Sequence, residues 1–321
     1  MVMPRLLYYD VLGYLPDNRA LLEKAFEVVS LPHPGHDAAT LLAGLDACCA
    51  PLGFDFDAAK MDLAPRLRAI ISNTTGVPHI DMAAAAERGI AVFSLRDEQE
   101  FLATITPTAE HAFGLMLALL RNTPWSFAAA LEGEWKRFDF GAPAMLSRLS
   151  LGLVGMGRLG RLMSRYGSAF GMKVRFFDPY VETGADGAEK LANLSELAAL
   201  SDVISIHAPA NHETRHLIDS GVLAECRPGA VLINTARGEL VDEVALLAAL
   251  DEGRLAGAAL DVLDGEYEPG FKAAEHALVA YARGHRNLLL TPHIGGSTED
   301  AWFETQRHVI ERAIAHFAAA G

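Results

Sequence analysis

The feature that most constrains the fold of this 321-residue chain is an apolar strand that runs into a glycine turn and then a helix, at residues 150–170. The segment reads S-L-G-L-V-G-M-G-R-L-G and carries G-x-G-x-x-G at Gly155, Gly157 and Gly160. The first glycine permits a tight turn, the second lets a pyrophosphate approach the backbone, and the third lets the helix pack on the strand. The segment therefore predicts a dinucleotide-binding unit.

The acidic residue expected at the end of the next strand is Asp178. Its carboxylate would hold the ribose hydroxyls of the adenosine and repel a 2′-phosphate, and residues 179–182 offer no Arg or Lys to neutralise one. NAD is therefore the predicted cofactor, in preference to NADP. The residues of this segment that we expect to contact NAD are Gly155, Met156, Gly157, Arg158, Leu159, Gly160, Asp178 and Pro179.

Short apolar strands alternate with helical segments along the chain. In the later part we expect strands at 150–154, 173–177, 202–206, 230–233, 256–260 and 287–290, with helices at 158–170, 194–200, 219–225, 242–252 and 272–281. The first hundred residues repeat this rhythm, with strands at 6–9, 69–72 and 90–93 and helices at 18–26 and 81–88. The predicted fold class is α/β with two doubly wound domains, one Rossmann-type and one flavodoxin-like.

Long helices at 106–121 and 299–319 suggest that the chain crosses between domains and returns. We expect a discontinuous substrate domain of residues 1–100 and 293–321, and a dinucleotide-binding domain of residues 101–292. Residues 122–149 are interpreted as an irregular, aromatic-rich arm. It packs either on its own domain or on the partner subunit of a homodimer.

Composition narrows the class of partner. The chain has 27 basic and 41 acidic residues and a net charge of −14, which argues against a nucleic-acid partner. Its three cysteines, two of them adjacent, suit a reducing cytoplasm better than a disulfide framework. No apolar run approaches the roughly 20 residues of a membrane span, and no signal peptide is recognisable. We expect a cytoplasmic globular protein with a small-molecule partner and no membrane partner.

Three predicted strands each end near a chemically distinctive residue: Arg237, the acidic segment 261–266, and His293. Ligands in open α/β sheets bind at the carboxyl ends of strands, so these groups can converge there. An Arg binds a carboxylate and polarises a neighbouring oxygen, while a His exchanges a hydroxyl proton and a carboxylate orients its ring. This set fits hydride transfer to and from a hydroxy acid.

The stretch 234–262, N-T-A-R-G-E-L-V-D-E-V-A-L-L-A-A-L-D-E-G-R-L-A-G-A-A-L-D-V, resembles the signature of the D-isomer-specific 2-hydroxyacid dehydrogenase family, and so does 201–218. The resemblance covers nearly the whole chain and implies an NAD-dependent oxidoreductase. It implies Arg237 as the substrate-binding residue, His293 as the general acid/base and Glu266 as its partner. Further cofactor contacts expected with it are His207, Ala208, Pro209, Thr214, Thr235, Ala236, Asp261, Gly295 and Gly296.

Glu266 is assigned by its spacing from Asp261. In many members the equivalent Glu is followed directly by Pro, whereas the Glu-Pro pair here is Glu268-Pro269, which leaves Glu268 as an alternative. The resemblance also implies a carboxylate-binding loop at 72–81, with Thr74, Thr75, Gly76, Arg237 and His293 as substrate ligands. Thr74 and Pro78 replace a Gly and an Asp of the commoner loop, so the identity of the hydroxy acid stays open.

Other functions remain as alternatives. One is a D-3-phosphoglycerate dehydrogenase without a regulatory domain, and another is a dinucleotide-sensing module like the C-terminal-binding corepressors. The H-E-x-x-H pattern at 212–216 and the pair His33 and His36 resemble metal motifs, but neither has the supporting ligands, so no metal is predicted.

Overall fold

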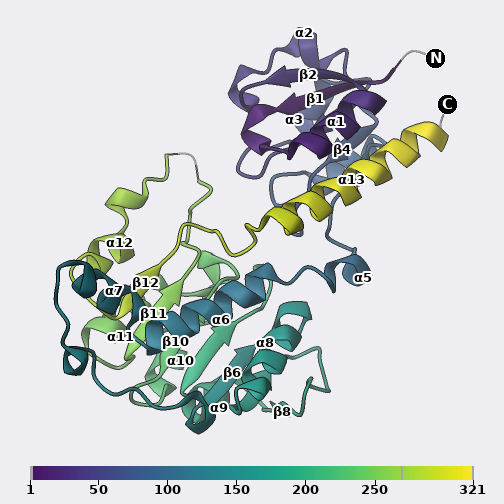
Figure 1. Cartoon of the computed structure of the whole chain (residues 1–321). Helices are drawn as coiled ribbons and strands as arrows, with labels where there is room; N and C mark the ends of the chain where they lie inside the picture. The colour runs from purple at the N-terminus through teal and green to yellow at the C-terminus, as the bar shows by residue number, and fades with distance from the viewer. Residues whose placement is uncertain (1–2, 269, 320–321) are drawn as a thin grey trace. The chain divides into compact units, whose positions relative to one another are not determined.

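The computed structural model of the chain describes residues 3–268 and 270–319 and separates into two compact units (Figure 1). Unit 1 comprises residues 1–105 and 297–321, and unit 2 comprises residues 106–296. The expected domain boundaries, at 100/101 and 292/293, lie a few residues before the unit boundaries of the structure, at 105/106 and 296/297. Residues 1–2, 269 and 320–321 of the expected domains, including Pro269, lie outside the described residues.

Unit 1 is built on a five-stranded parallel sheet in the order β2-β1-β3-β4-β5, which is the flavodoxin-like order. Its strands are β1 (Arg5–Tyr9), β2 (Glu27–Leu31), β3 (Ala47–Cys49), β4 (Ala69–Ile71) and β5 (Ala91–Phe93). The helices between and after them are α1 (Pro16–Ala25), α2 (Ala39–Leu42), α3 (Ala58–Asp62), α4 (Met82–Glu87) and α5 (Gln99–Leu102). The C-terminal helix α13 (Glu299–Ala319) packs on α1, β4 and β5.

The adjacent cysteines show how this sheet is buried on both faces. Side chains alternate along a strand, so Cys48 packs with Leu7 and Ile70, whereas Cys49 joins the opposite cluster with Ile71 and Val309 of α13. Both thiols are free and fully buried.

Unit 2 contains a seven-stranded parallel sheet in the order β12-β11-β10-β9-β6-β7-β8. Its strands are β6 (Ser150–Val154), β7 (Lys173–Phe177), β8 (Glu189–Lys190), β9 (Val203–Ile206), β10 (Val231–Asn234), β11 (Gly257–Leu260) and β12 (Leu288–Leu290). The chain runs outward from β6 to β8 and restarts on the other side at β9. The doubly wound α/β prediction is therefore confirmed, with its switch point between β6 and β9.

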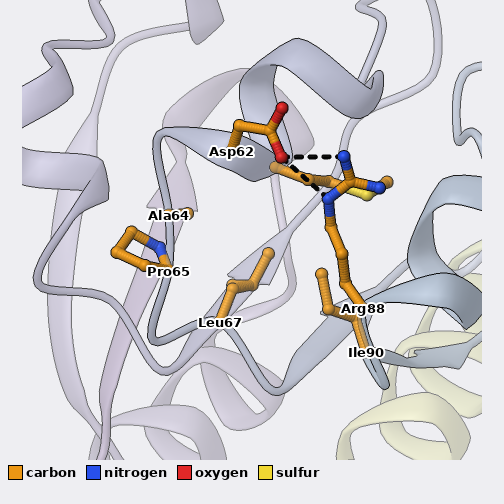
Figure 2. Close-up of a pocket in the computed structure, with 7 residues that line it drawn as sticks. Asp62, Ala64, Pro65, Leu67, Arg88 and Ile90 are labelled. Atoms are coloured by element: carbon orange, nitrogen blue, oxygen red, sulfur yellow. Dashed lines mark hydrogen bonds and ion pairs between the residues drawn. The ribbon is translucent and has the colours of Figure 1, made fainter.

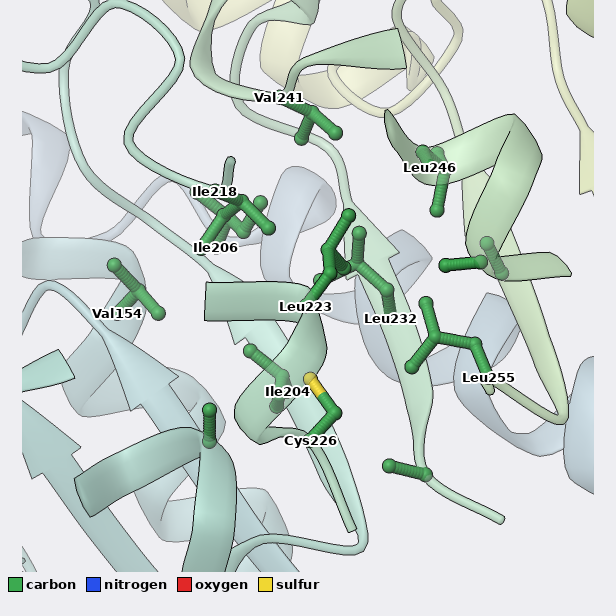
Figure 3. Close-up of a cluster of buried hydrophobic side chains, with 14 of the residues drawn as sticks. Val154, Ile204, Ile206, Ile218, Leu223, Cys226, Leu232, Val241, Leu246 and Leu255 are labelled. Atoms are coloured by element: carbon green, nitrogen blue, oxygen red, sulfur yellow. The ribbon is translucent and has the colours of Figure 1, made fainter. Parts of the chain in front are cut away.

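Helices cover both faces of the unit 2 sheet. On one face, the buried cluster of Figure 3 joins Ile204 and Leu232 to Leu223 and Leu246 from helices. The helices of that face are α9 (Leu194–Leu200), α10 (Ser220–Glu225), α11 (Glu243–Asp251) and α12 (Ala277–Ala282). On the other face, strand residues such as Ile233 pack against α6 (Pro107–Leu120) and α8 (Arg158–Ala169). The strands are apolar on both sides, as parallel strands between helix layers must be.

Three sequence expectations need correction. The segment 122–149 is not irregular throughout, because α7 (Thr123–Leu131) starts with Pro in its first turn and continues through an alanine run, which both favour a helix. The helix expected at 272–281 is a short 3-10 turn, Ala273–Glu275, followed by α12. The two-residue strand β8 adds to the six expected, and its charged residues gave no apolar signal.

In the part of the chain that the structure describes, no helix is both long and apolar enough to cross a membrane.

Candidate functional site

Most of the expected site residues of unit 2 follow directly on its parallel strands, so they lie along one edge of the sheet, at the carboxyl ends. Gly155 follows β6, and His207 follows β9 on the neighbouring strand. Arg237, Asp261 and His293 follow β10, β11 and β12, which are also adjacent. This edge is where ligands of open α/β sheets bind.

The glycine loop has the geometry that a pyrophosphate needs. Gly155 has φ +97°, and a Cβ there would lie 2.9 Å from the His207 carbonyl oxygen. A Cβ at Gly160 would overlap the Gly155 carbonyl oxygen, so this glycine allows α8 to approach β6. A Cβ at Gly157 would meet nothing within 4 Å. That open space lies at the start of α8, where free backbone N–H groups and the helix dipole favour an anion.

Asp178 directly follows β7, beside this loop. Its Oδ2 accepts a hydrogen bond from Met156 N at 2.8 Å, and its Oδ1 accepts bonds from Tyr180 N and Val181 N at 2.8 and 3.1 Å. The carboxylate is therefore fixed next to the turn that would carry the pyrophosphate. This is the position from which an acidic residue reaches a ribose.

Two buried polar atoms at this edge have no hydrogen-bond partner among the described residues: His207 Nδ1 and Thr235 Oγ1. His207 is held through Nε2, which lies 2.8 Å from Ser205 Oγ, and burial lowers the pKa of this imidazole to about 4. Unsatisfied buried polar atoms are rare in folded proteins. Together with the open space at Gly157, they indicate that this edge is built for a polar ligand such as a dinucleotide.

The turn after β10 presents Arg237. Asn234 braces it, because its Nδ2 donates to the Arg237 carbonyl at 2.8 Å and its Oδ1 accepts from Ala236 N at 3.0 Å. Gly238 is required here, since a Cβ would overlap the backbone of Leu263. Arg237 is half-buried, and among the described residues its guanidinium donates only to the Ala236 carbonyl, at 2.6 Å. No described carboxylate lies within ion-pair distance of its guanidinium, which is thus available for an anionic ligand.

Asp261 anchors the loop that carries His293. Its Oδ1 accepts from Thr291 Oγ1 at 2.6 Å and from Ile294 N at 2.9 Å, and its Oδ2 accepts from Gly295 N at 2.7 Å. His111 Nε2 from α6 lies 3.3 Å from Oδ1. Burial favours the neutral acid, but these hydrogen bonds outweigh it and hold the pKa of Asp261 below its usual range. Both oxygens are thus engaged within the protein.

His293 stands at the end of this loop in a left-handed backbone conformation, with φ +53°. Its Nδ1 lies 2.7 Å from Glu266 Oε1 and 3.1 Å from Tyr267 Oη. The alternative carboxylate, Glu268, instead lies over Gly265, with its Cδ 3.4 Å from the position of a Cβ there. The geometry therefore pairs His293 with Glu266. A non-glycine residue at positive φ is uncommon and is concentrated at functional sites.

The remaining expected residues divide between the units. In unit 2, the Thr214 hydroxyl donates to the Pro209 carbonyl at 2.7 Å and so closes its own loop. In unit 1, Thr74 Oγ1 donates to the Gly76 carbonyl at 2.7 Å and lies 3.0 Å from Ser72 Oγ. Thr75 is exposed at the tip of that loop. The H-E-x-x-H segment lies in turns and not on a helix.

A hollow of about 270 Å³ in unit 1 is a separate feature (Figure 2). It is lined by Met61, Leu67 and Ile90, and the ion pair of Arg88 with Asp62, 2.7 Å between Nη2 and Oδ1, lies at it. Leu67 and Ile90 precede β4 and β5, so the hollow lies at the amino ends of these strands. Ligands of such sheets bind at the opposite ends, and we assign it no role in the site.

Sequence reasoning missed three residues of this site: Tyr267 beside His293, and His111 and Thr291 beside Asp261. The position of Tyr267 directly after Glu266 was a usable signal. His111 and Thr291 are 180 positions apart, so only the fold reveals their contact. Within residues 3–268 and 270–319, no group of three or more His, Cys, Asp or Glu could hold a metal ion.

Comparison with protein families agrees with this geometry. Residues 113–295 match the model described as the D-isomer specific 2-hydroxyacid dehydrogenase, NAD binding domain. A D-3-phosphoglycerate dehydrogenase of Mycobacterium bovis is 34% identical over 309 residues, which cover 94% of this chain and 54% of the relative. The chain thus spans about half the length of the curated relatives it matches.

Two solved structures are similar along nearly the whole chain. A 2-hydroxyacid dehydrogenase of Ketogulonicigenium vulgare has a TM-score of 0.84 and 28% identity, and the match covers 99% of this chain and 96% of that one. A D-lactate dehydrogenase of Aquifex aeolicus, complexed with NAD and lactic acid, has a TM-score of 0.79 and 26% identity, with 98% and 94% covered.

Proposed function

Because this chain belongs to the D-isomer specific 2-hydroxyacid dehydrogenase family and carries its NAD-binding domain, we propose that it interconverts a D-2-hydroxy acid and the matching 2-keto acid. The observation that carries the proposal is the 2.7 Å contact between His293 Nδ1 and Glu266 Oε1. This pair lies at the same sheet edge as the glycine loop and Arg237, whose guanidinium has no carboxylate partner among the described residues. Acid–base, anion-binding and cofactor groups therefore share one edge.

Each residue has a distinct proposed role. Arg237 binds the substrate carboxylate and polarises the C2 oxygen through its fixed guanidinium fork. Glu266 orients the His293 ring and stabilises its protonated form. Asp261 holds the His293 loop through Ile294 N and Gly295 N. Thr74, Thr75 and Gly76 are the proposed carboxylate ligands from unit 1.

NAD would fit this edge: Gly157 leaves room for the pyrophosphate, and Asp178 lies beside the glycine turn, within reach of a ribose. His207 Nδ1 and Thr235 Oγ1, which have no partner among the described residues, offer further polar contacts. The reduced cofactor, when bound, supplies a hydride to C2 of the keto acid. As that bond forms, the carbonyl electron pair moves to the C2 oxygen, which takes the proton from His293 Nε2. Nδ1 keeps its hydrogen, which stays hydrogen-bonded to Glu266, and Nε2 of His293 is reprotonated from solvent. Oxidation reverses these steps.

The name of the curated relatives supports a second candidate, the oxidation of D-3-phosphoglycerate. D-3-phosphoglycerate is itself a D-2-hydroxy acid, so the reaction class is the same. The phosphate on its C3 oxygen distinguishes it from the unphosphorylated acids of the first candidate. The loop 72–81, expected to meet the substrate, contains no Arg or Lys. A phosphate dianion is usually bound by such cations, so we place the unphosphorylated acids first.

The test is the oxidation of NADH by a panel of 2-keto acids in the presence of the purified chain. The reaction is monitored through the near-ultraviolet absorbance of NADH. The panel contains glyoxylate, hydroxypyruvate, pyruvate, branched and aromatic keto acids, and phosphohydroxypyruvate. We expect turnover of at least one, with His293→Ala lowering kcat by about 10²-fold or more. Turnover of phosphohydroxypyruvate alone would favour the second candidate. NADH binding without turnover of any acid would favour the dinucleotide-sensing module.

We also propose a cytoplasmic homodimer. The three buried free thiols fit a reducing compartment. The segment after α7 exposes large apolar side chains, which a partner subunit would cover.

A further inference from the structure

The phenol of Tyr267 reaches the same nitrogen of His293 that Glu266 holds. Tyr267 Oη lies 3.1 Å from His293 Nδ1, and Glu266 Oε1 lies 2.7 Å from it. The two ring centroids are 5.7 Å apart, with the planes inclined at 54°. Both contacts fall on one edge of the imidazole, which leaves the other nitrogen, Nε2, turned away from them.

The donor and acceptor roles follow from the chemistry of the groups. An ionised carboxylate only accepts hydrogen bonds, so Nδ1 carries the hydrogen in the contact with Glu266. The Tyr267 oxygen then accepts from the same N–H, and the hydrogen bond is shared between two acceptors. One acceptor lets the ring rotate about the line from Nδ1 to Oε1. A second acceptor off that line fixes the plane of the ring.

Tyr267 stays neutral while it does this. The residue is 41% exposed, and the burial of the remainder, followed by the negative charge of Glu266, raises the pKa of Tyr267 to about 12, against the opposing charge of Arg237. Glu239 and Asp261 are the other charged groups that act on the phenol, and both raise its pKa. Glu266 therefore supplies the charge beside His293, while Tyr267 supplies a neutral oxygen at every working pH.

We propose that Tyr267 is a positioning residue for His293: Glu266 sets the Nδ1–H tautomer, and the phenol oxygen of Tyr267 fixes the plane of the imidazole so that Nε2 is presented to the substrate oxygen. This inference rests on the proposed function of His293. Many members of the family have Pro at the position after the Glu, and Pro has no hydroxyl. The device therefore belongs to this chain and not to the family pattern.

Tyr267→Phe removes the oxygen and keeps the ring and all the surrounding charges. Tyr281→Phe is the matched control. Tyr281 lies on α12, and its hydroxyl accepts a hydrogen bond from Asn287 Nδ2 at 3.2 Å, so this variant also loses one phenol hydrogen bond. We expect Tyr267→Phe to lower kcat about threefold to tenfold, with a smaller change in KM. The shared bond is stronger when the ring is charged, so its loss disfavours the protonated ring. The pH at which keto-acid reduction is lost should fall by about half a unit or more.

A second measurement needs no substrate. In NMR spectra of the chain labelled with ¹⁵N-histidine, His293→Gln identifies the His293 signals. We expect both proteins to show the Nδ1–H tautomer that Glu266 sets. In Tyr267→Phe the Nδ1–H proton signal of His293 should move upfield and broaden, because one acceptor is lost and the ring can rotate about the remaining hydrogen bond. If Tyr267→Phe matches Tyr281→Phe in both the pH profile and the Nδ1–H signal of His293, the proposal is wrong. If the Nδ1–H signal changes as expected while wild type reduces no keto acid, the proposed function fails but the positioning role stands.

Discussion

Two glutamates that lie two positions apart provide a matched test at the scale of single residues. Glu266 contacts His293 Nδ1 at 2.7 Å, whereas Glu268 lies over Gly265. Glu266→Gln removes the charge that stabilises the protonated ring, so we expect kcat for keto-acid reduction to fall about tenfold or more. Glu268→Gln, the same chemical change, should stay within about twofold of wild type in the same steady-state assay. The reverse order would move the pairing to Glu268.

Asp178 provides a test of cofactor choice. Asp178→Asn keeps an oxygen for the backbone N–H of Met156 and removes the charge that would repel a 2′-phosphate. We expect the ratio of kcat/KM for NADH over NADPH to narrow about tenfold, which corresponds to about 1.4 kcal/mol. An unchanged ratio, with the variant folded by circular dichroism, would show that the ribose is held elsewhere.

His207 makes the stability of the chain depend on pH. Burial lowers the pKa of His207 to about 4, so between that pH and the usual value near 6.5 the unfolded chain binds a proton that the folded chain does not. Stability must therefore fall as the pH falls through this window. We expect wild type to lose about 2 kcal/mol more than His207→Gln between about pH 7 and pH 5, by urea unfolding without cofactor. Equal losses would mean that His207 is not buried as neutral imidazole.

At the scale of elements, Gly157, in the turn before α8, and Gly160, in the first turn of α8, have separable roles. Gly160→Ala forces α8 away from β6, because the new Cβ overlaps the Gly155 carbonyl, so we expect a stability loss of about 1–3 kcal/mol. Gly157→Ala places its Cβ in open space, so the melting temperature should stay the same. The affinity for NADH, measured by fluorescence titration, should still fall about tenfold or more, since the methyl group fills the space of the pyrophosphate. Unchanged affinity in Gly157→Ala would place the pyrophosphate elsewhere.

Elements with a strong apolar period were predictable from sequence, and weakly patterned ones were not. β6 and α13 start and end where the sequence predicts them, because an apolar strand or a long amphipathic helix carries its own signal. β8 was missed, since a two-residue edge strand of Glu and Lys is stabilised by pairing with β7 and by ion pairs such as Lys173 with Glu189. The sequence signal for α7 is mixed, because the aromatic residues Trp125 and Phe127 have low helix propensity, whereas the Pro in its first turn and its alanine run favour a helix.

The same division holds for the candidate site. Arg237, Glu266 and His293 lie within recognisable segments, and the parallel sheet predicts that their strand ends share an edge. The left-handed φ of His293, the shared contact of Tyr267 and the bond between His111 and Thr291 depend on loop geometry and distant contacts. Local sequence carries no direct record of such contacts.

At the scale of the whole molecule, the segment 127–145 of unit 2 predicts how copies of the chain associate. Its large apolar side chains are strongly exposed, with 89% of Trp135 and 80% of Phe138 accessible to solvent. Phe127, Leu131 and Met145 are also exposed. A soluble monomer seldom leaves such a group of aromatic and aliphatic side chains uncovered, and aromatic residues are enriched at subunit interfaces. A second copy of the chain is therefore the expected cover.

Light scattering coupled to gel filtration tests this directly. Wild type should have about twice the chain mass of 34.5 kDa, and the double variant Trp135→Glu, Phe138→Glu should have the mass of one chain. Charges in the centre of an apolar interface remain unpaired and desolvated, which costs several kcal/mol and is enough to separate the subunits. Val244→Glu is the control, because Val244 is 82% exposed on α11 of the same unit but lies outside this segment. A double variant that stays dimeric would place the interface on another face of the molecule.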